Sequence, residues 1–326
     1  MSLNLKFWGV RGSIPSSYTP AEWSQHFDSL IRGFLATGYN DVQHIQKYFN
    51  SIGLSRSGGF GTATTCVEVQ TPQTRLIIDG GTGIRTLSEK IMSGTHGNLK
   101  GPFHIFMTHF HWDHVIGLPF FAPHFIPGVQ IHYYAVHPDL EQNIRSVFRK
   151  PFFPVVFENL PSKIHFHVVE PRKPFMINDL SVTPYLLDHP DPCWGLKAQW
   201  KNKAYAHCVD TEGTRVSRED LGPDLPLYQN IDVMYYDAQY TFPELVEKSN
   251  WGHSASQIGL DIAIRENIKR VLFTHHDPGA TIQQIHELKR QTQEYMDNRV
   301  EMAKENEEIL PNVEWEFAHE GMEIKL

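Results

Sequence analysis

The sequence predicts an α/β protein, built as one domain over residues 1–326 from two halves that each combine a sheet with helices. Apolar segments with the two-residue period of strands recur along the chain and alternate with segments of helical period. Several of these strands end directly in histidine or aspartate. With 326 residues, 40% of them hydrophobic and 20% charged, the chain can bury a sizeable core. No internal repeat or low-complexity linker divides it.

The first half is expected to begin with a strand and to carry a helical insertion at about 16–57. Residues 3–9 alternate apolar and polar side chains, as a half-buried strand does. In the insertion, Thr19-Pro20-Ala21-Glu22 has the form of a capping box, Gly38 ends that helix, and a shorter helix is expected at 42–52. Strands at 64–69, 75–78 and 103–107 and a helix at about 84–92 are expected to follow.

The second half is expected to contain further strands and two long helices. Up to about residue 174 the periodicity is weak, and strands are expected only at 130–134 and 164–169. Proline cannot donate to a ladder, so Pro184 makes the next strand an edge or a bent strand. A capping box at Ser254-Ala255-Ser256-Gln257 is expected to open a helix at 254–266. The remaining expected elements are strands at 180–187, 204–209, 231–236, 271–274 and 313–325 and a helix at 281–305.

The segment 108–114, Thr-His-Phe-His-Trp-Asp-His, carries the strongest chemical signal. An extended chain sends alternate side chains to one face, so His109, His111 and Asp113 can converge, with His114 turned toward a neighbouring point. Imidazole nitrogens and carboxylate oxygens are the mixture that borderline-soft divalent cations prefer. Four potential ligands within six residues predict two metals held side by side.

Later strands deliver further ligand types at their carboxyl ends. His189 follows the strand at 180–187, Asp210 follows 204–209, Asp237 follows 231–236, and His275 follows 271–274. Loops at the carboxyl ends of strands are where α/β folds usually place their sites. We therefore expect these side chains to complete the metal centre begun at 108–114.

This set of residues resembles the metallo-β-lactamase superfamily, specifically its two-metal hydrolase branch. The resemblance covers nearly the whole chain outside 16–57, and it implies a four-layer αββα sandwich. It also implies two metals. One would take His109, His111 and His189, and the other would take Asp113, His114 and His275. Asp210 would bridge them. The iron-redox branch of the superfamily typically has glutamate where this chain has His111, and that departure favours a hydrolytic site.

A second motif, Trp251-Gly252-His253-Ser254, resembles the Gly-His-Ser motif of the phosphodiesterase members of the superfamily. These members include the tRNA 3′-end nucleases and the phosphonate-pathway cyclic phosphodiesterase. The resemblance implies that His253 is not a ligand but contacts the scissile phosphate as a general acid or electrostatic stabiliser. The start of the helix expected at Ser254 would suit that work, since its dipole favours a phosphoryl group.

His275 and His276 compete for one ligand position. His275 directly follows the strand, where the family places its ligand, so we favour it and expect His276 behind the ligands or in solvent. Asp277 could orient a ligand imidazole or form a turn with the following Pro278-Gly279.

Other polar side chains have weaker signals. Asp79 matches the family's Asp-x-Gly turn and is expected to hydrogen-bond a ligand histidine. Asp237 could support the ligands or form a turn. His165 and His167 share one strand face, but nothing completes a metal set there, so we expect them on the strand surface.

The expected function is a two-metal hydrolase, in the first place a phosphodiesterase acting on a small or cyclic nucleotide-type phosphodiester through a metal-bridging hydroxide. Asp113, Asp210 and His253 are the expected catalytic side chains. The alternative is a thioester or acyl hydrolase of the glyoxalase II type, which does not need His253. A scaffold with a vestigial site normally lacks a ligand, and none is missing here. Nitrogen-rich sites favour zinc, although manganese and iron fit the same ligands.

The expected partner is a small phosphodiester molecule rather than tRNA or a membrane. The net charge of -8 disfavours non-specific attraction to polyanions, and no Gly/Pro-rich basic arm for RNA is visible. The aromatic side chains of the insertion could instead cover the site and stack on a base, or simply pack onto the sandwich; they are Trp23, Phe27, Phe34, Tyr39 and Tyr48.

The cysteines and the lack of targeting signals predict a soluble, cytoplasmic protein. Cys66, Cys193 and Cys208 are an odd number without a C-x-x-C pair, so we expect inert buried thiols rather than disulfides or metal donors. No signal peptide or apolar stretch of membrane-spanning length is visible. The oligomeric state stays open, a homodimer included.

Overall fold

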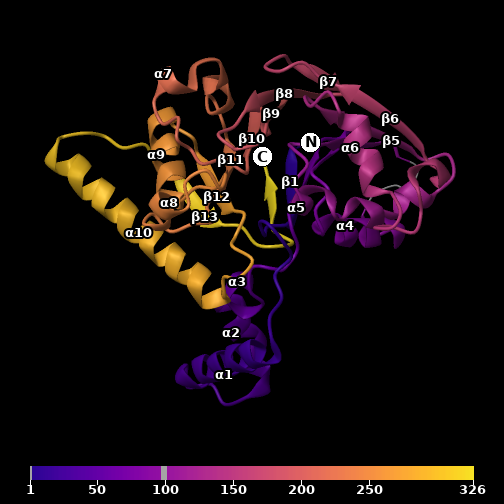
Figure 1. The fold of residues 1–326 in the computed structure, drawn as a ribbon. Coiled ribbons are helices and arrows are strands. Elements are labelled where there is room, and N and C mark those ends of the chain that lie inside the picture. The colour runs from indigo at the N-terminus through magenta and orange to yellow at the C-terminus, as the bar shows by residue number, and fades with distance from the viewer. Residues whose placement is uncertain (1, 97–100) are drawn as a thin grey trace.

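The computed structural model describes residues 2–96 and 101–326, which form two stacked sheets flanked by helices (Figure 1). The first sheet has the order β14 (Glu323–Lys325), β1 (Asn4–Gly9), β2 (Cys66–Gln70), β3 (Arg75–Ile78), β4 (Phe103–Phe106), β5 (Gln130–Ala135) and β6 (Lys163–Val168). The second has the order β13 (Glu314–Phe317), β12 (Arg270–Thr274), β11 (Val233–Asp237), β10 (Lys203–Cys208), β9 (Trp194–Trp200), β8 (Leu180–Leu186) and β7 (Phe175–Ile177).

Three apolar layers hold the sheets and helices together. Successive strand residues face opposite sides of a sheet, so in β12 Leu272 lies between the sheets whereas Val271 and Phe273 lie under the outer helices. Helices α4 (Gly83–Met92) and α6 (Leu140–Val147) cover the first sheet, and α9 (Ser256–Glu266) and α10 (Ile282–Glu305) cover the second. The predicted α/β class and the four-layer αββα sandwich are thereby confirmed.

The strand directions bring the carboxyl ends of both sheets to one edge. In the first sheet β3 to β6 run parallel, and in the second β10 to β13 run parallel. Loops that start at this edge can therefore meet between the two halves.

Short helices occupy the connections: α5 (Trp112–Val115), α7 (Arg218–Leu221), α8 (Glu244–Glu247) and the 3-10 turns η2 (Leu118–Phe120), η3 (Ala122–Phe125), η4 (Phe157–Asn159) and η5 (Gly222–Leu227).

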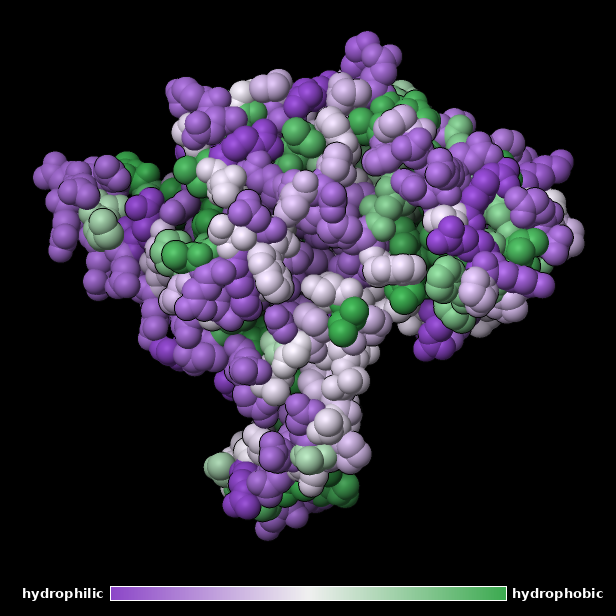
Figure 2. Space-filling model, in the orientation of Figure 1, coloured by the Kyte–Doolittle hydropathy of each residue, from purple (hydrophilic) through white to green (hydrophobic). Residues whose placement is uncertain are grey.

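The residues of the predicted insertion form helices that project from the sandwich (Figure 1): α1 (Pro20–Ala36), η1 (Val42–His44), α2 (Ile45–Ile52) and α3 (Leu54–Ser57). The predicted capping box at Thr19 and Glu22 is formed. The aromatic side chains pack largely on one another, with ring centroids 5.7 Å apart for Phe34 and Tyr48. Figure 2 shows apolar residues at the end of this projection, where α1 exposes Phe27 and other large apolar side chains.

Two predicted elements were wrong in detail. The helix expected from Ser254 begins at Ser256 without a side-chain cap, because the Ser254 N–H donates instead to Asp237 Oδ1 (3.1 Å). The strand expected at 313–325 is two strands in different sheets, because the chain turns at Gly321 with φ of +80°.

The other boundaries fall close to the expected ones. The position of Pro184 inside a strand also has a simple explanation. It lies inside β8, beyond the stretch that pairs with β7, so its missing N–H interrupts no ladder on that side. Within the described residues, no helix combines the length and the apolar character that crossing a bilayer requires.

We expect Leu272→Ala to lower the free energy of unfolding by about 2–5 kcal/mol, because it empties space between the two sheets. The side chain of Leu272 is fully buried there. Urea denaturation at matched metal content measures the change. Leu54→Ala, at a position that is 68% exposed, is the control and should change stability by less than about 0.5 kcal/mol. An unchanged midpoint for Leu272→Ala would contradict the layer assignment.

Candidate metal centre

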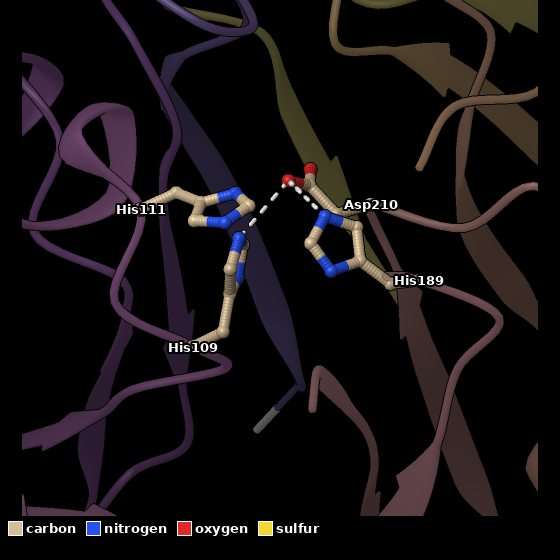
Figure 3. A group of neighbouring side chains, drawn as sticks. All are labelled: His109, His111, His189 and Asp210. Atoms are coloured by element: carbon tan, nitrogen blue, oxygen red, sulfur yellow. Dashed lines mark ion pairs between the residues drawn. The ribbon is translucent and has the colours of Figure 1, made fainter. Parts of the chain in front are cut away.

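The seven predicted metal ligands lie together at the edge where the two sheets present their carboxyl ends. His109 and His111 follow β4, Asp113 and His114 lie in α5, and the other three follow strands of the second sheet: His189, Asp210 and His275. Figure 3 shows His109, His111 and His189 pointing toward Asp210 from both halves of the molecule. Three groups of side chains have converging ligand atoms: His109/His111/His189/Asp210, Asp113/His114/Asp210/His275 and Asp210/Asp237/His253/His275. Asp210 belongs to all three groups.

The Asp210 carboxylate is the closest common neighbour of the histidines. Its Oδ2 lies 3.2 Å from His109 Nε2, 3.2 Å from His114 Nε2 and 4.0 Å from His189 Nε2. Its Oδ1 lies 2.8 Å from His275 Nε2. The other carboxylate, Asp113 Oδ2, lies 3.1 Å from the same His275 nitrogen. The geometry therefore places one buried carboxylate between imidazoles from both sheets.

Asp79 orients two of the histidines. His114 Nδ1 donates to Asp79 Oδ2 (2.8 Å), because a carboxylate can only accept. The Thr108 hydroxyl also donates to Asp79, so its oxygen is left to accept the N–H of His109 Nδ1 (3.1 Å). Both histidines consequently turn Nε2 toward Asp210. The hydrogen bond predicted for Asp79 is present.

Asp191 and Gln239 orient the other histidines, and sequence reasoning did not identify either of them. Asp191 accepts from His111 Nε2 through its carboxylate and from His189 Nδ1 through its backbone carbonyl, both at 2.8 Å. Gln239 Oε1 accepts from His275 Nδ1 (3.0 Å). Each ring thus has one nitrogen committed to an orienting acceptor, as metal-binding histidines do, and His275 Nε2 also contacts Asp113 Oδ2 (3.1 Å). The position of Asp191 two residues after His189 was the available signal.

Unsatisfied buried atoms show that these residues fit divalent cations. His109 Nε2, His114 Nε2 and Asp210 Oδ1 are buried and make no hydrogen bond, although both nitrogens lie 3.2 Å from Asp210 Oδ2. A buried polar atom without a partner costs about 1–3 kcal/mol, and three lone pairs aimed at one region are rarely tolerated. Cations that accept these lone pairs would remove that cost. The donor set of imidazole and carboxylate fits divalent metal binding.

The charges of the cluster are strongly coupled. Burial alone would raise the pKa of the Asp210 carboxyl, but the imidazoles of His275 and His114 outweigh burial and hold its pKa well below the usual value. Burial alone would lower the pKa of His275, but the carboxylates of Asp210 and Asp113 raise that pKa to about 10. In contrast, burial and the neighbouring His114 lower the pKa of His109 to about 4. Without metal, protons on the imidazoles compensate the buried carboxylates.

The loop after β1 closes the site from the N-terminal side. The Ser13 N–H donates to Asp113 Oδ2 (2.8 Å), and the backbone of Gly12 packs directly on the rings and amide around His275. The buried Arg11 guanidinium donates to the carbonyls of Asp277 and Ala280 and to the Tyr18 hydroxyl. It therefore ties the helical projection to the loop that carries His275.

The structure separates His275 from its neighbour His276. His276 is buried, donates from Nε2 to the Ala318 carbonyl (2.8 Å) and stacks on Phe317, so it points away from the cluster. The Asp277 carboxylate accepts the Gly279 N–H (2.7 Å), which is the turn role rather than the ligand-orienting one.

His253 lies beside the predicted ligands and belongs, with Asp237, to the third group of converging side chains. Its Nδ1 donates to Asp237 Oδ2 (3.1 Å), and its ring centroid is 4.8 Å from that of His275. The same Asp237 carboxylate accepts the backbone N–H groups of Asp210 (3.2 Å) and Ser254 (3.1 Å). Asp237 therefore supports the site, and the turn alternative accounts for only part of its contacts.

The remaining chemical groups lie apart from the ligand set. The three cysteines are buried and free, and burial raises the pKa of the Cys193 thiol, so it stays protonated beside His109. His167 Nε2 lies 3.0 Å from His132 Nδ1 on β6 and β5, and His165 stacks on the same ring. In the described residues, neither strand histidine joins a group of three or more ligands.

Comparisons with known proteins agree with this architecture. The family described as "Beta-lactamase superfamily domain" matches residues 74–276, more than half of the chain. Curated relatives include ribonuclease Z of Azobacteroides pseudotrichonymphae, 25% identical over 53% of this chain and 68% of that protein. Ribonuclease Z of Streptococcus pneumoniae is 24% identical over 63% of this chain and 81% of its own.

Solved structures with a similar fold cover almost the entire chain. The metallo-beta-lactamase fold protein YhfI from Bacillus subtilis has a TM-score of 0.63 at 13% identity, covering 100% of this chain and 99% of its own. A diphosphatase from the PhnP family has a TM-score of 0.58 at 17% identity, covering 99% and 98%. Human tRNase Z, short form, has a TM-score of 0.57 at 15% identity, covering 98% of each chain. At sequence identities of 13% to 17%, these similarities show that the chain shares the fold of these proteins.

We expect Gly12→Ala to weaken metal binding although Gly12 supplies no ligand. A Cβ there would lie 2.4 Å from His275 Nδ1 and 2.5 Å from Gln239 Oε1, so the His275 ring would have to move. Loss of such a supporting contact typically costs about 10–100-fold in metal affinity. Competition with a chelator measures it. Gly58→Ala is the control, because its Cβ would meet only the Leu54 carbonyl at 3.5 Å, and equal affinities in both variants would contradict the expectation.

We also expect metal binding at pH 7 to release protons, since His114 and His275 have raised pKa values in the metal-free protein and must lose protons to act as ligands. Metal affinity should therefore fall as the pH is lowered. Titration calorimetry in buffers of different ionisation enthalpy should show at least about one proton released per protein. Binding heats that do not depend on the buffer would rule out these protonation states.

Proposed function

The chain belongs to the beta-lactamase superfamily, and from that premise we propose that it is a metal-dependent phosphodiesterase with two divalent cations, zinc in the first place. Its proposed substrate is a small or cyclic nucleotide-type phosphodiester. The observation that carries this proposal is the pair His253–Asp237, which lies directly beside the shared metal ligands and converges with Asp210 and His275.

In this proposal the two cations share Asp210. His109, His111 and His189 would hold one, Asp113, His114 and His275 would hold the other, and the convergence of their ligand atoms supports this division. When bound, such a pair neutralises the charge of phosphoryl oxygens and makes a water molecule acidic enough to attack at neutral pH. The protein supplies the orientation, because every histidine of the set has its second ring nitrogen engaged by a neighbour.

His253 would protonate the leaving oxygen. Its Nδ1–H is committed to the Asp237 carboxylate, which fixes the orientation of the ring. No hydrogen bond within the described residues engages His253 Nε2, so that nitrogen can give its proton to substrate. Because Asp237 also accepts the Asp210 N–H, one carboxylate sets the position of the acid relative to the shared ligand.

The size of the substrate is inferred from charge. The net charge of -8 opposes the binding of a long polyanion, whereas a local pair of cations can still attract a single phosphodiester. The curated relatives are named ribonuclease Z, so a tRNA precursor belongs among the test substrates beside small diesters and thioesters.

We expect metal-loaded protein to hydrolyse cyclic and p-nitrophenyl phosphodiesters and to leave thioesters intact. His253→Ala should lower phosphodiester kcat by about 10²–10⁴-fold, since it removes the general acid, while metal content stays the same. Steady-state rates and metal analysis measure both.

His165→Ala, on the exposed face of β6, is the matched control and should keep full activity. Thioester turnover without phosphodiester turnover would reject the proposal in favour of an acyl hydrolase. Exclusive cleavage of the tRNA precursor would reject the small substrate.

A further inference from the structure

A cavity of about 200 Å³ lies immediately beside the metal-binding loop. Phe110 and Trp112 line it, and in the chain they alternate with the ligands His109, His111 and Asp113. Helix α6 and the segment after it form the opposite wall, with Asn143, Ser146, Val147, Arg149 and Phe152. The cavity therefore borders the loop that carries His109, His111 and Asp113, but none of the proposed ligands lines it.

The aromatic walls of this cavity are unusually accessible. The side chains of Trp112 and Phe152 are 66% and 70% exposed, and Phe110 is half-buried between them and the core. Figure 2 shows apolar residues grouped over the region of α5. Apolar surface collected around a hollow on an otherwise acidic protein is typical of a ligand site rather than of random exposure.

Polar groups complete the cavity on the side of α6. Asn143 and Ser146 are three residues apart on this helix and therefore share one face. The Asn143 side-chain amide makes no hydrogen bond within the described residues. The Arg149 guanidinium lies 5.4 Å from the centre of the Phe152 ring, and in the described part of the chain it has no ion-pair partner. A planar ligand would meet aromatic faces, a free amide and a cation.

We propose that this cavity binds the nucleobase of the substrate, an inference that rests on the phosphodiesterase function proposed above. Its volume is below the roughly 300–1,000 Å³ of sites for drug-sized ligands, so it suits one ring system rather than an entire nucleotide. Bases of any kind stack on aromatic side chains, and an arginine adds cation–π attraction. Asn143 can hydrogen-bond the edge of the base. The protein would thus select nucleoside diesters over alkyl diesters.

Binding of two product-like phosphates tests this inference. Metal-loaded protein is titrated with AMP and with ribose 5-phosphate, which share the phosphate and the sugar but differ by the base. Wild-type protein should bind AMP about tenfold more tightly. Phe152→Ala should remove most of that advantage and leave the Kd for ribose 5-phosphate unchanged, because Phe152 lies outside the ligand-bearing segment. Phe27→Ala, at a similarly exposed aromatic on α1, should behave as wild type.

The outcomes separate the two proposals. Equal Kd values for both phosphates in wild-type protein that cleaves diesters would reject the base cavity and keep the phosphodiesterase. A Phe152→Ala variant that weakens both phosphates equally, or a Phe27→Ala variant with the same effect, would also reject it. Failure to bind either phosphate together with absent diester cleavage would reject the phosphodiesterase itself.

Discussion

The buried carboxylate of Asp210 is the constraint on which the arrangement of this molecule depends. A carboxylate removed from water is tolerated only where positive charge or donors surround it, and here imidazoles from both sheets do so. His109 and His114 come from the loop after β4, whereas His275 comes from the end of β12, so the two halves must stack in one register for Asp210 to be satisfied. The apolar layer between the sheets sets that register, and the polar cluster requires it.

Around this carboxylate, orientation is obtained from groups that are not themselves ligands. Asp79, Asp191 and Gln239 each take the N–H of a histidine, which decides where the opposite lone pair points. The backbone is also unusual here, because Asp79, Asp210 and His275 all have φ near +62°, in the left-handed region. That conformation is uncommon for residues other than glycine, and it persists where surrounding contacts over-determine it. The strained positions coincide with the predicted metal site.

Much of this could be predicted from the sequence because the signals were local. Alternation in 108–114 and polar residues at strand ends depend on neighbours in the chain, so His109 and His275 were recognisable. The contacts of Gln239 and of the Ser13 N–H were not, because they arise only when distant segments meet in space. The same reason explains the helix expected at Ser254: its local sequence fits a cap, but Asp237, seventeen residues away, competes successfully for its N–H. The roles of the predicted metal ligands and the identity of the substrate stay predictions, which the experiments above test.

The contacts of the Arg11 guanidinium limit the substitutions and deletions that this protein can tolerate. Its donors reach acceptors in three separate segments, including Tyr18 at the base of the helical projection. A lysine has a single compact ammonium and could not span these acceptors, so the two cations are not interchangeable at this position. Excising the projection would also leave a donor stranded in the interior. The projection is thus anchored to the loops beside the candidate metal centre, and its removal in an engineered or evolving homologue would have to be accompanied by a new hydrogen-bond partner for that arginine.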